Sequence, residues 1–577
     1  MGGTQLWKRA THAGHAYRSW GCAGSISKDK DWNKFLNFKR QTDMGLSIKS
    51  ETFFSVNPRN GEVLGTFTPT DPDEISNLVH KARSAFHYWA SLSLKTRMEI
   101  TKKAYQEFYR HQDEIASLIS QETGKPLVEA YSCEILPILD GFKYYLRTIK
   151  PLLKPQKITS NNPLFKLRKG YVVYEPLGVI AVISPWNYPF LLSMQHIIPA
   201  LLTGNAVVHK PSEFTTLTSL KIREIFDKAN LPRDVFQVVT GLADVGQALV
   251  NSKLDKIYFT GSTTVGQKIY EAAAKQLIPV NLELGGSDPM IVLEDANLER
   301  AASAAIWGAF VNTGQACVSV ERLYVQESIH QTFLDLLLKK LNKIRFSANY
   351  HQDGEISCLV NEQQFNKISR IIEDALAKGA VIKFGGKPRK DLGTWYYEPT
   401  VLTRVNTSMK LLKEECFGPV LAVIPFENEE EAIALANHSE YGLSASIWTQ
   451  NRKRGQELAH HIQSGSVLIN DLQIHIAQPE APYLGYKKSG LGVSHGPWGV
   501  MEMVHPKYIN YDRPWVMGLL KWLFRPLADH DPWWYPYTPE RVEDFKNFAI
   551  FLHSRSLWQQ VKVLPKVLKA LFRKDYL

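Results

Sequence analysis

The chain has 577 residues, of which 44% are hydrophobic and 22% charged, so it can build a large core and is too long for one simple domain. Its net charge of +11 comes from basic residues spread along the whole sequence, without an RNA- or DNA-binding motif, which argues against a nucleic acid partner. No run of about twenty uninterrupted apolar residues is present, so a membrane-spanning helix is not expected.

The five cysteines are an odd number, widely scattered, and lack the paired short spacings of a disulfide scaffold or a zinc site. This usage indicates a reducing compartment, and the lack of HExxH, CxxC and EF-hand patterns predicts no bound metal. No acidic residue precedes Asp29, yet the N-terminus lacks the apolar core of a secretory signal. A transit peptide, a flexible arm and a later start at Met44 all fit. We therefore expect a cytoplasmic protein, with organellar targeting left open.

The region from about residue 50 onward has the composition of a globular protein and begins with helices. Asp71 and Pro72 form a cap and first turn, after which apolar residues recur at helical spacing. These residues are Ile75, Leu78, Val79, Ala82, Phe86 and Trp89. A second long helical run is predicted to end near "TGKP" at 123–126.

Short apolar runs alternate with helical stretches from 170 to 290 and again from 285 to 480. The first region contains "LGVIAVIS", "NAVVHK", "DVFQVVT", "KIYFTGS" and "VNLEL"; the second contains "MIVL", "RLYV", "PVLAVIPF" and "GSVLIN". This alternation predicts βαβ units, and therefore two α/β domains with a doubly wound parallel sheet. The basic segment 148–175 has no good helical period, and we expect an extended hairpin suited to subunit contact.

The tail from 511 to 577 differs in composition, because it holds five of the fourteen tryptophans and many prolines. Near its end, "SLWQQVKVLPKVLKALFRK" predicts an amphipathic helix. One face carries Leu557, Val561, Leu564, Leu568, Leu571 and Phe572, and the other carries Lys562, Lys566, Lys569 and Arg573. This pattern is typical of a membrane-surface anchor, which predicts peripheral membrane contact through 555–574. Packing on this protein or on a partner subunit is the alternative, and Pro565 would kink a continuous membrane face.

Two segments at strand ends are candidates for nucleotide contacts. "FTGSTTVG" (259–266) places Gly261 and Ser262 at a helix N-terminus, where free N–H groups attract anions. "VVHKPSE" (207–213) places Lys210 and Glu213 after another strand, where both could share ribose hydroxyls. A plain strand-to-helix turn and a surface ion pair are the respective alternatives.

Three further residues have the chemistry of a covalent catalyst. Asn187 in "ISPWNYPF" is held between two prolines and could donate to an oxyanion, with a plain turn as the alternative. Glu283 in "NLELGG" lies in an apolar strand, as a candidate general base with a raised pKa or a partnered structural residue. Cys317 in "VNTGQACVSVERLYV" follows a glycine loop. A single thiol is usually packing material, but its combination with the other two favours a nucleophile.

Together these segments resemble the aldehyde dehydrogenase superfamily. "LELGG" and "TGQAC", with Glu283 and Cys317 thirty-four positions apart, resemble its two active-site signatures. "PWNYP", "KPSE", "FTGST", "EECFGPV" (414–420) and "YKKSGLG" (486–492) occur in the family's order. The resemblance covers about residues 50 to 510. It implies an α/β fold with a Rossmann-like cofactor-binding domain, an α/β catalytic domain and a small β oligomerisation element.

The resemblance also implies how the chain is divided. Residues 45–150 and 176–284 would form the NAD(P)-binding domain, and 285–485 the catalytic domain. Residues 151–175 and 497–512 would form the oligomerisation element of a homodimer or homotetramer. Residues 1–44 would be a flexible N-terminal extension, and 513–577 an amphipathic C-terminal extension.

The implied reaction is the NAD(P)-dependent oxidation of an aldehyde to a carboxylic acid. Cys317 would attack the aldehyde as a thiolate, and Asn187 with the Cys317 backbone N–H would stabilise the oxyanion of the thiohemiacetal. Glu283 would activate the water that hydrolyses the thioester. The residues that the resemblance assigns to the cofactor are Ser184, Trp186, Lys210, Glu213, Gly261, Ser262, Glu415 and Phe417. Glu213 would repel a 2′-phosphate and so favours NAD, although a rotated carboxylate tolerates NADP.

Two departures from the family pattern shape the expectations. Cys416 stands where the family often has isoleucine, which would place a second thiol near the nicotinamide. Gln195 and Val311 stand where succinate-semialdehyde enzymes carry arginines for the substrate carboxylate, so we predict an apolar aliphatic or aromatic aldehyde. Its channel would be lined by Phe190, Leu191, Met194, Trp307 and Phe310.

Three alternatives stand beside this prediction: a succinate-semialdehyde-type enzyme, an acylating relative that passes the thioester to coenzyme A, and a non-catalytic scaffold on the same fold. Retention of Glu283 favours hydrolysis over acyl transfer. Retention of Cys317 and Asn187 beside it argues against a scaffold.

Overall fold

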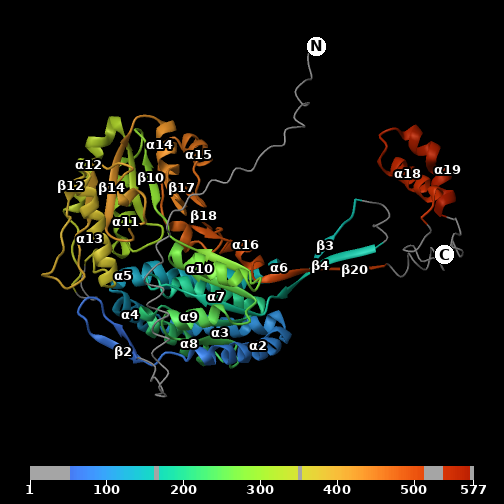
Figure 1. Cartoon of the computed structure of the whole chain (residues 1–577), viewed down its shortest axis with the longest axis horizontal. Helices are drawn as coiled ribbons and strands as arrows, with labels where there is room; N and C mark the ends of the chain where they lie inside the picture. Colours follow the sequence, from blue (N-terminus) through green and yellow to red (C-terminus); the bar gives the residue numbers. More distant parts are fainter. Residues whose placement is uncertain (1–51, 162–167, 349–353, 513–536, 572–577) are drawn as a thin grey trace, which may run out of the picture. The chain divides into compact units, whose positions relative to one another are not determined.

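Two large sheets organise the described part of the chain, which comprises residues 52–161, 168–348, 354–512 and 537–571 of a computed structural model (Figure 1). A six-stranded sheet has the order β19-β9-β8-β5-β6-β7, and a seven-stranded sheet has the order β12-β13-β14-β11-β10-β16-β17. In both sheets most successive strands are joined through helices. The fold is therefore α/β, as the alternating pattern predicted.

The six-stranded sheet is parallel except for β19, which runs antiparallel to β9. Its strands are β5 (Val179–Ile183), β6 (Ala206–Lys210), β7 (Phe236–Val238), β8 (Lys256–Thr260), β9 (Val280–Glu283) and β19 (Gly490–Leu491). The helices between them are α7 (Leu191–Thr203), α8 (Thr216–Lys228), α9 (Ala243–Val250) and α10 (Thr263–Ala274). The strand order reverses between β5 and β8. Such a reversal is where doubly wound sheets bind ligands.

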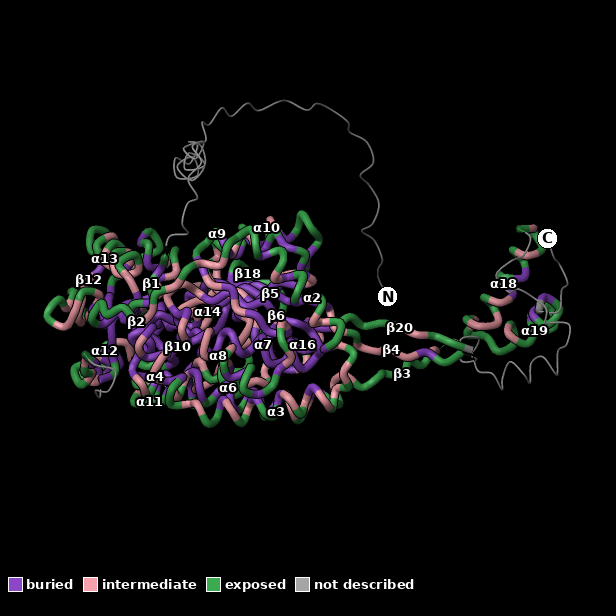
Figure 2. The backbone as a smooth tube through the Cα atoms, turned by 90° about the horizontal axis from the view of Figure 1, so that it is seen from below, coloured by how far each residue is buried: buried purple, intermediate pink, exposed green. Residues whose placement is uncertain are grey.

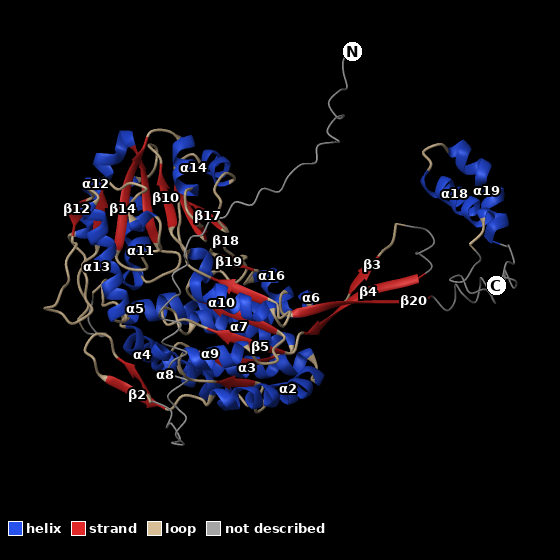
Figure 3. Cartoon of the chain, in the orientation of Figure 1, coloured by secondary structure: helices blue, strands red, loops and turns tan. Residues whose placement is uncertain are grey.

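Residues of β5 alternate between two apolar cores, which explains why its sequence is apolar throughout. Ile180 and Val182 belong to a core shared with α7. Val179 and Ala181 belong to a second core shared with α9, α10 and α2 (Ile75–Ser91). Helices therefore cover both faces of the sheet (Figure 3). A strand that is buried on both faces has no polar side to show in its sequence.

The N-terminal helices confirm the predicted cap and divide the predicted second run. The Asp71 carboxylate accepts from the backbone N–H of Asp73, ahead of a short 3₁₀ turn that leads into α2. The run predicted as one helix is two, α3 (Leu94–Arg110) and α4 (Gln112–Thr123). The second ends at Gly124, whose φ of 78° lies in the left-handed region that favours glycine.

The seven-stranded sheet is parallel except for its edge strand β12, which pairs antiparallel with β13. Its strands are β10 (Asp288–Val292), β11 (Val320–Gln326), β12 (Val381–Phe384), β13 (Thr400–Thr403), β14 (Val420–Phe426), β16 (Ser444–Trp448) and β17 (Ser466–Ile469). The helices that pack against it are α11 (Leu298–Phe310), α12 (Glu327–Leu341), α13 (Glu362–Ala377), α14 (Glu429–Asn437) and α15 (Arg452–Ala459). The strands predicted in this region are confirmed.

A three-stranded antiparallel sheet has the order β20-β4-β3 and consists of β3 (Gln156–Ile158), β4 (Arg168–Pro176) and β20 (Val504–Asp512). Exposed and half-buried residues dominate it, in contrast to the buried strands of the large sheets (Figure 2). The predicted hairpin is confirmed for β3 and β4 but is wrong for its first residues. Helix α6 (Leu136–Leu152) continues past residue 148 because Ile149 is fully buried in the core of the six-stranded sheet.

Short elements complete the described region. The pairs β1 (Phe53–Val56) with β2 (Val63–Phe67), and β15 (Tyr441–Gly442) with β18 (Tyr486–Lys487), are antiparallel. Helix α5 (Leu127–Ala130) leads through a π-helical turn, Tyr131–Ile135, into α6, and α16 (Gly496–Met501) precedes β20.

The C-terminal helices are α18 (Pro539–His553) and α19 (Leu557–Leu571), which contact each other. The predicted amphipathic helix is confirmed, but the face that it buries is not the leucine face. Val563, Val567 and Ala570 are buried, whereas the exposed residues of α19 include Leu557, Trp558, Val561, Leu564 and Leu568. The predictions for Trp515, Trp522, Trp533, Trp534, Phe572 and Arg573 lie outside the described residues. Within the described ranges, no helix is both long enough and apolar enough to cross a membrane.

Candidate active site

The two segments that carry Glu283 and Cys317 meet in space. Strand β9 ends at Glu283, and Gly286, the second of the two glycines that follow, lies against the Cys317 backbone. A methyl group on Gly286 would lie 2.1 Å from the carbonyl oxygen of Cys317, so only glycine permits this approach. The structure therefore brings the thiol loop to the carboxyl end of the six-stranded sheet.

The loop before Cys317 has an unusual backbone. Asn312 and Thr313 have φ angles of 52° and 56°, and Gly314 follows with 72°. The left-handed region is unfavourable for residues with a Cβ atom, so contacts must hold this loop. The Asn312 N–H donates to the Glu129 carboxylate at 2.9 Å, and its amide donates to the carbonyls of Asn187 at 3.0 Å and Gln315 at 3.1 Å.

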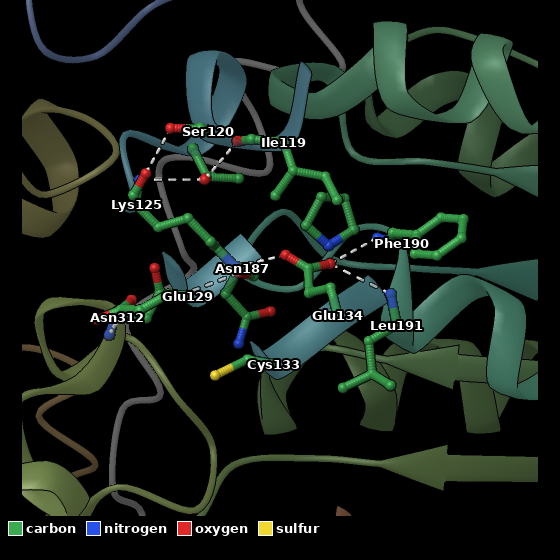
Figure 4. A network of polar contacts seen from close by, with 12 residues as sticks. Ile119, Ser120, Lys125, Glu129, Cys133, Glu134, Asn187, Phe190, Leu191 and Asn312 are labelled. Atoms are coloured by element: carbon green, nitrogen blue, oxygen red, sulfur yellow. Dashed lines mark hydrogen bonds and ion pairs between the residues drawn. The ribbon is translucent and has the colours of Figure 1, made fainter. Parts of the chain in front are cut away.

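A buried ion pair supports the turn that carries Asn187 (Figure 4). The Lys125 ammonium donates to the Glu134 carboxylate at 2.6 Å and to the Asn187 carbonyl at 2.7 Å. The second oxygen of Glu134 accepts from the N–H groups of Phe190 at 2.9 Å and Leu191 at 3.2 Å, at the start of α7. Sequence analysis missed this pair, whose only signal was the "TGKP" segment that it treated as a helix end.

The Asn187 side chain reaches the thiol loop. Its amide nitrogen donates to the Gln315 carbonyl at 3.1 Å, two residues before Cys317, and the side chain is buried. One amide N–H is thus engaged, and the second is the candidate donor for an oxyanion formed at Cys317.

The Cys317 thiol lies in a small apolar cluster with Val318, Leu443 and Tyr483. Its sulfur is 3.4 Å from the Tyr483 hydroxyl. Burial raises the pKa of this thiol to about 12, so the thiolate is strongly disfavoured in the free protein. A nearby proton acceptor is therefore required for the thiol to act as a nucleophile.

The Glu283 carboxylate is fully buried and has several partners. One oxygen accepts from the Gln195 amide at 2.9 Å and the Thr260 hydroxyl at 3.2 Å, and the other accepts from the Ser494 hydroxyl and lies 3.5 Å from His196. Burial by itself raises the pKa of Glu283, but His196 and the Ser494 hydroxyl outweigh it and hold the pKa below its usual value. The predicted raised pKa is therefore wrong, because the partners come from segments distant in sequence.

Gln195 also binds the neighbouring histidines. Its amide nitrogen lies 3.2 Å from His196, and its amide oxygen lies 3.0 Å from the ring nitrogen of His495. Burial lowers the pKa of His495 to about 4, so this ring is neutral at pH 7. Gln195, which the sequence places where succinate-semialdehyde enzymes carry an arginine, thus hydrogen-bonds Glu283 in this structure.

The candidate cofactor residues line the carboxyl edge of the six-stranded sheet. In the sheet register, Ile183 at the end of β5 pairs with Lys210 of β6 and with Phe259 of β8. Ser184 and Trp186 follow β5, and Gly261 and Ser262 follow β8, so these residues flank the point where strand order reverses. This placement suits a dinucleotide.

Two details at this edge differ from the expectations. Lys210 is buried and donates to the Pro211 carbonyl at 3.0 Å. The alternative interpretation of Lys210 and Glu213 as a surface ion pair is therefore wrong. The Gly261 N–H donates to the Glu283 carbonyl at 3.0 Å and is not available to a phosphate. A methyl group on Gly261 would lie 2.5 Å from the Phe259 ring, so glycine is needed there for space. Ser262 caps α10, as predicted, because its hydroxyl accepts from the Val265 N–H.

Glu415 and Phe417 face this edge from the seven-stranded side. The Glu415 carboxylate accepts from the Gly286 N–H at 3.1 Å, and the Phe417 ring lies 5.5 Å from the Trp186 ring. Sequence analysis missed Glu321, a buried carboxylate on β11 that accepts from the N–H groups of residues 416 and 417 at 2.7 and 2.9 Å. Burial raises the pKa of Glu321 to about 8.

Cys416 lies in the apolar core and does not face the nicotinamide position that the sequence predicted. It is 1% exposed and packs with apolar residues of α13, β13 and β14. The prediction of a second thiol at the cofactor site is therefore wrong. Cys416 lies between Glu415 and Phe417 in the sequence, but its side chain packs into the core.

The predicted apolar channel is also largely wrong. Phe190, Leu191 and Met194 belong to the core of the six-stranded sheet, and Phe310 to a core of the seven-stranded sheet. Their exposed fractions are 5% or less, whereas Trp307 is 45% exposed. The apolar side chains nearest the thiol are instead those of the cluster around Cys317, with Ile476 packed against it.

This chain matches one known protein family over most of its length. The model of the aldehyde dehydrogenase family matches residues 47–509, which is most of the chain. The chain is 37% identical to the 4,4′-diapolycopene aldehyde oxidase of a Methylomonas species over 87% of this chain and 91% of that protein. It is 36% identical to the peroxisomal aminoaldehyde dehydrogenase 1 of Pisum sativum over 80% and 93% of the two chains.

Solved structures agree with the sequence relatives. The betaine aldehyde dehydrogenase of Staphylococcus aureus, in complex with NAD+, matches with a TM-score of 0.76 and 34% identity over 81% of this chain and 92% of that one. An NADP-dependent enzyme of E. coli matches with a TM-score of 0.76 and 33% identity over 80% and 95%.

Proposed function

Because this chain belongs to the aldehyde dehydrogenase family, we propose that Cys317, Glu283 and Asn187 are the nucleophile, the base and the oxyanion donor of an aldehyde oxidation. The protein is an aldehyde dehydrogenase, an oxidoreductase that acts on the aldehyde group with NAD(P) as acceptor. One observation supports these residue roles. Gly286 lies against the carbonyl oxygen of Cys317, so strand β9, which ends at Glu283 three residues earlier, ends beside the thiol loop.

In the proposed mechanism the Cys317 thiolate attacks the carbonyl carbon, and the carbonyl electron pair moves to the oxygen. The free N–H of the Asn187 amide stabilises that oxyanion. Glu283, whose lowered pKa keeps it ionised at pH 7, accepts the thiol proton and releases it to solvent. It then accepts a proton from the water that hydrolyses the acyl thioester on Cys317, and returns this proton to the sulfur as the acid forms. Bound NAD(P)+ supplies the hydride acceptor. The acid product then leaves, and the thiol is restored.

The residues proposed to hold the cofactor are Ser184, Trp186, Lys210, Glu213, Gly261, Ser262, Glu415 and Phe417. Their position at the strand reversal supports this assignment. We propose NAD as the preferred cofactor, because the Glu213 carboxylate near the adenosine ribose would repel a 2′-phosphate.

We propose an apolar aldehyde as the substrate. The side chains packed around the Cys317 thiol are Val318, Leu443, Tyr483 and Ile476, a set without charge. Val311, at the other predicted substrate-carboxylate position, is buried and uncharged. The similarity to an oxidase whose name specifies the aldehyde of a polyene points the same way.

An aldehyde panel tests this substrate class. Aldehydes of two to sixteen carbons, an aromatic aldehyde and succinate semialdehyde are assayed with NAD and with NADP. We expect kcat/KM for the medium- and long-chain aldehydes to exceed that for succinate semialdehyde at least about tenfold, because the side chains packed around the thiol, Val318, Leu443, Tyr483 and Ile476, carry no positive charge for a second carboxylate. A best rate with succinate semialdehyde would show that the apolar assignment is wrong. NADP turnover above NAD turnover would overturn the proposed role of Glu213.

We propose that the three-stranded sheet β20-β4-β3 mediates assembly into a homodimer or homotetramer. The β3 strand is exposed along its whole length, and β4 and β20 pair over nine residues each. An exposed edge strand with free backbone groups is suited to pairing with another chain.

We propose that the protein is cytoplasmic and that α18 and α19 contact a membrane surface peripherally. The leucine face of α19 is exposed, with Leu557 at 76% and Val561 at 60%, and Val542 and Ile550 of α18 are exposed as well. Lysines 562, 566 and 569 accompany these apolar residues on α19, and the Lys562 ammonium lies 5.0 Å from the centre of the Trp558 ring. Exposed apolar residues with adjacent lysines suit a bilayer with anionic lipids.

Sedimentation with vesicles tests this contact. The full chain is expected to co-sediment with phosphatidylserine-containing vesicles more than with pure phosphatidylcholine vesicles. The double variant Leu564→Ser, Leu568→Ser should reduce binding by about tenfold or more, because it removes apolar area that would be buried in the membrane. Val563→Ala, on the buried face, is the matched control. A chain without residues 555–577 that still co-sediments as well as the full chain would assign the tail a structural role only.

A further inference from the structure

The side chain of Tyr483 contacts the sulfur of Cys317 through its hydroxyl group. Its hydroxyl oxygen lies 3.4 Å from the sulfur, and the tyrosine is 2% exposed. Burial raises the pKa of Tyr483 well above its usual range, so the hydroxyl keeps its proton at any working pH. A neutral O–H group at this distance is a hydrogen-bond donor to a thiolate.

A backbone bridge and two rings fix the position of this hydroxyl. The Tyr483 N–H donates to the Ser494 carbonyl, and the Ser494 N–H donates to the Tyr483 carbonyl, both at 2.8 Å. The Tyr483 ring stacks on the His495 ring at a centroid distance of 5.7 Å and lies at the same distance from the His475 ring. The hydroxyl is therefore positioned before any substrate arrives.

The other groups around the sulfur oppose a negative charge on it. Burial and the carboxylates of Glu415, Asp288 and Glu283 raise the pKa of the Cys317 thiol, whereas the hydrogen bond with Tyr483 lowers it. Hydrogen bonds to an ionised group are roughly twice as strong as those between neutral groups. Tyr483 thus counteracts the surroundings of the thiolate without introducing a second charge.

We propose that Tyr483 is a catalytic residue that donates a hydrogen bond to the Cys317 thiolate while the sulfur acts as the nucleophile; this rests on the proposed role of Cys317. The thiol proton goes to Glu283 and the Tyr483 proton stays on its oxygen. As the sulfur–carbon bond forms, the carbonyl electron pair moves to the aldehyde oxygen and the sulfur loses its charge. The Tyr483 hydrogen bond therefore acts mainly on the thiolate, before the bond to carbon is complete.

Alkylation of Cys317 tests the proposal without any aldehyde. The rate of reaction with iodoacetamide is measured for the NAD-bound wild type and for Tyr483→Phe, which removes only the hydroxyl, with Cys317→Ser as the background. Each unit by which a thiol pKa rises lowers the thiolate fraction about tenfold and raises its nucleophilicity about threefold, so the net rate falls about threefold. We expect a fall of about three- to tenfold in alkylation and in kcat/KM, with NAD affinity unchanged.

A matched control and a second variant make the result decisive. Tyr396→Phe removes another buried hydroxyl, which donates to the Ser347 carbonyl at 3.0 Å, and should leave both rates within about twofold of wild type. A 3-fluorotyrosine placed at position 483 keeps the ring and makes the hydroxyl a stronger donor, so alkylation should accelerate. The proposal is overturned by any of three results. Tyr483→Phe is alkylated at the wild-type rate, Tyr396→Phe loses as much rate as Tyr483→Phe, or the fluorotyrosine variant is alkylated no faster than the wild type. An error in the substrate class would change the aldehyde panel and leave these alkylation results as they are.

Discussion

Cys317→Ser is expected to abolish aldehyde oxidation while leaving cofactor binding intact. A serine hydroxyl in this buried site has no means of ionising, so kcat should fall by about four orders of magnitude or more. The side chain lies in the cluster with Val318, Leu443 and Tyr483, and Cys317 is not among the residues proposed to hold the cofactor, so NAD affinity should remain within about twofold. Steady-state NADH formation and a direct titration of NAD binding measure the two effects.

Cys133→Ser is the matched control for this variant. Cys133 is also a half-buried free cysteine, but it lies on the π-helical turn and not in the thiol loop. Its turnover should stay near that of the wild type. Residual activity of Cys317→Ser above about one per cent, or an equal loss in Cys133→Ser, would contradict the assignment of the nucleophile.

Lys125→Met is expected to destabilise the fold much more than the loss of an exposed lysine. It keeps the length of the side chain but leaves the Glu134 carboxylate buried without its cation, which costs about 3–5 kcal/mol in the free energy of unfolding. It also removes the donor to the Asn187 carbonyl, so kcat should fall together with stability. Thermal unfolding and steady-state kinetics of the same preparation measure both effects.

Two comparisons isolate the cause. The exposed pair of Lys143 and Asp140, at 3.5 Å, is a surface ion pair, so Lys143→Met should change the free energy of unfolding by about 0.5 kcal/mol or less. Adding Glu134→Gln to Lys125→Met removes the unpaired buried charge and should recover part of the loss. Equal unfolding midpoints for Lys125→Met and Lys143→Met would show that the buried pair contributes little.

The fold class and the main strands could be predicted from local patterns. β5 is apolar because both of its faces are buried, and a doubly wound parallel sheet follows from such strands and the helices between them. The start of the hairpin could not be predicted in the same way. Residue 149 belongs to helix α6 and not to the hairpin because its side chain is buried in a core formed by distant segments.

The candidate site was predictable in its residue types and less so in its contacts. Glu283 and Cys317 stand in recognisable segments, but the pKa of Glu283 depends on His196 and Ser494, which lie far from it in sequence. Apolar residues of a channel and of a core are the same residue types, so Phe190 could not be assigned to one or the other without its neighbours. Tyr483 differs from an ordinary buried aromatic residue only through a contact across 166 positions.

The bridge between Tyr483 and Ser494 lies in a stretch of the chain that is synthesised late. Residues 483 to 494 leave the ribosome long after the segments with Glu283 and Cys317, and strand β19, paired with β9, lies within the same stretch. A nascent chain that ends before this stretch carries both signature segments, but its thiol lacks the Tyr483 contact and its base lacks the Ser494 contact. The contacts of the proposed site are therefore complete only when most of the polypeptide has been made.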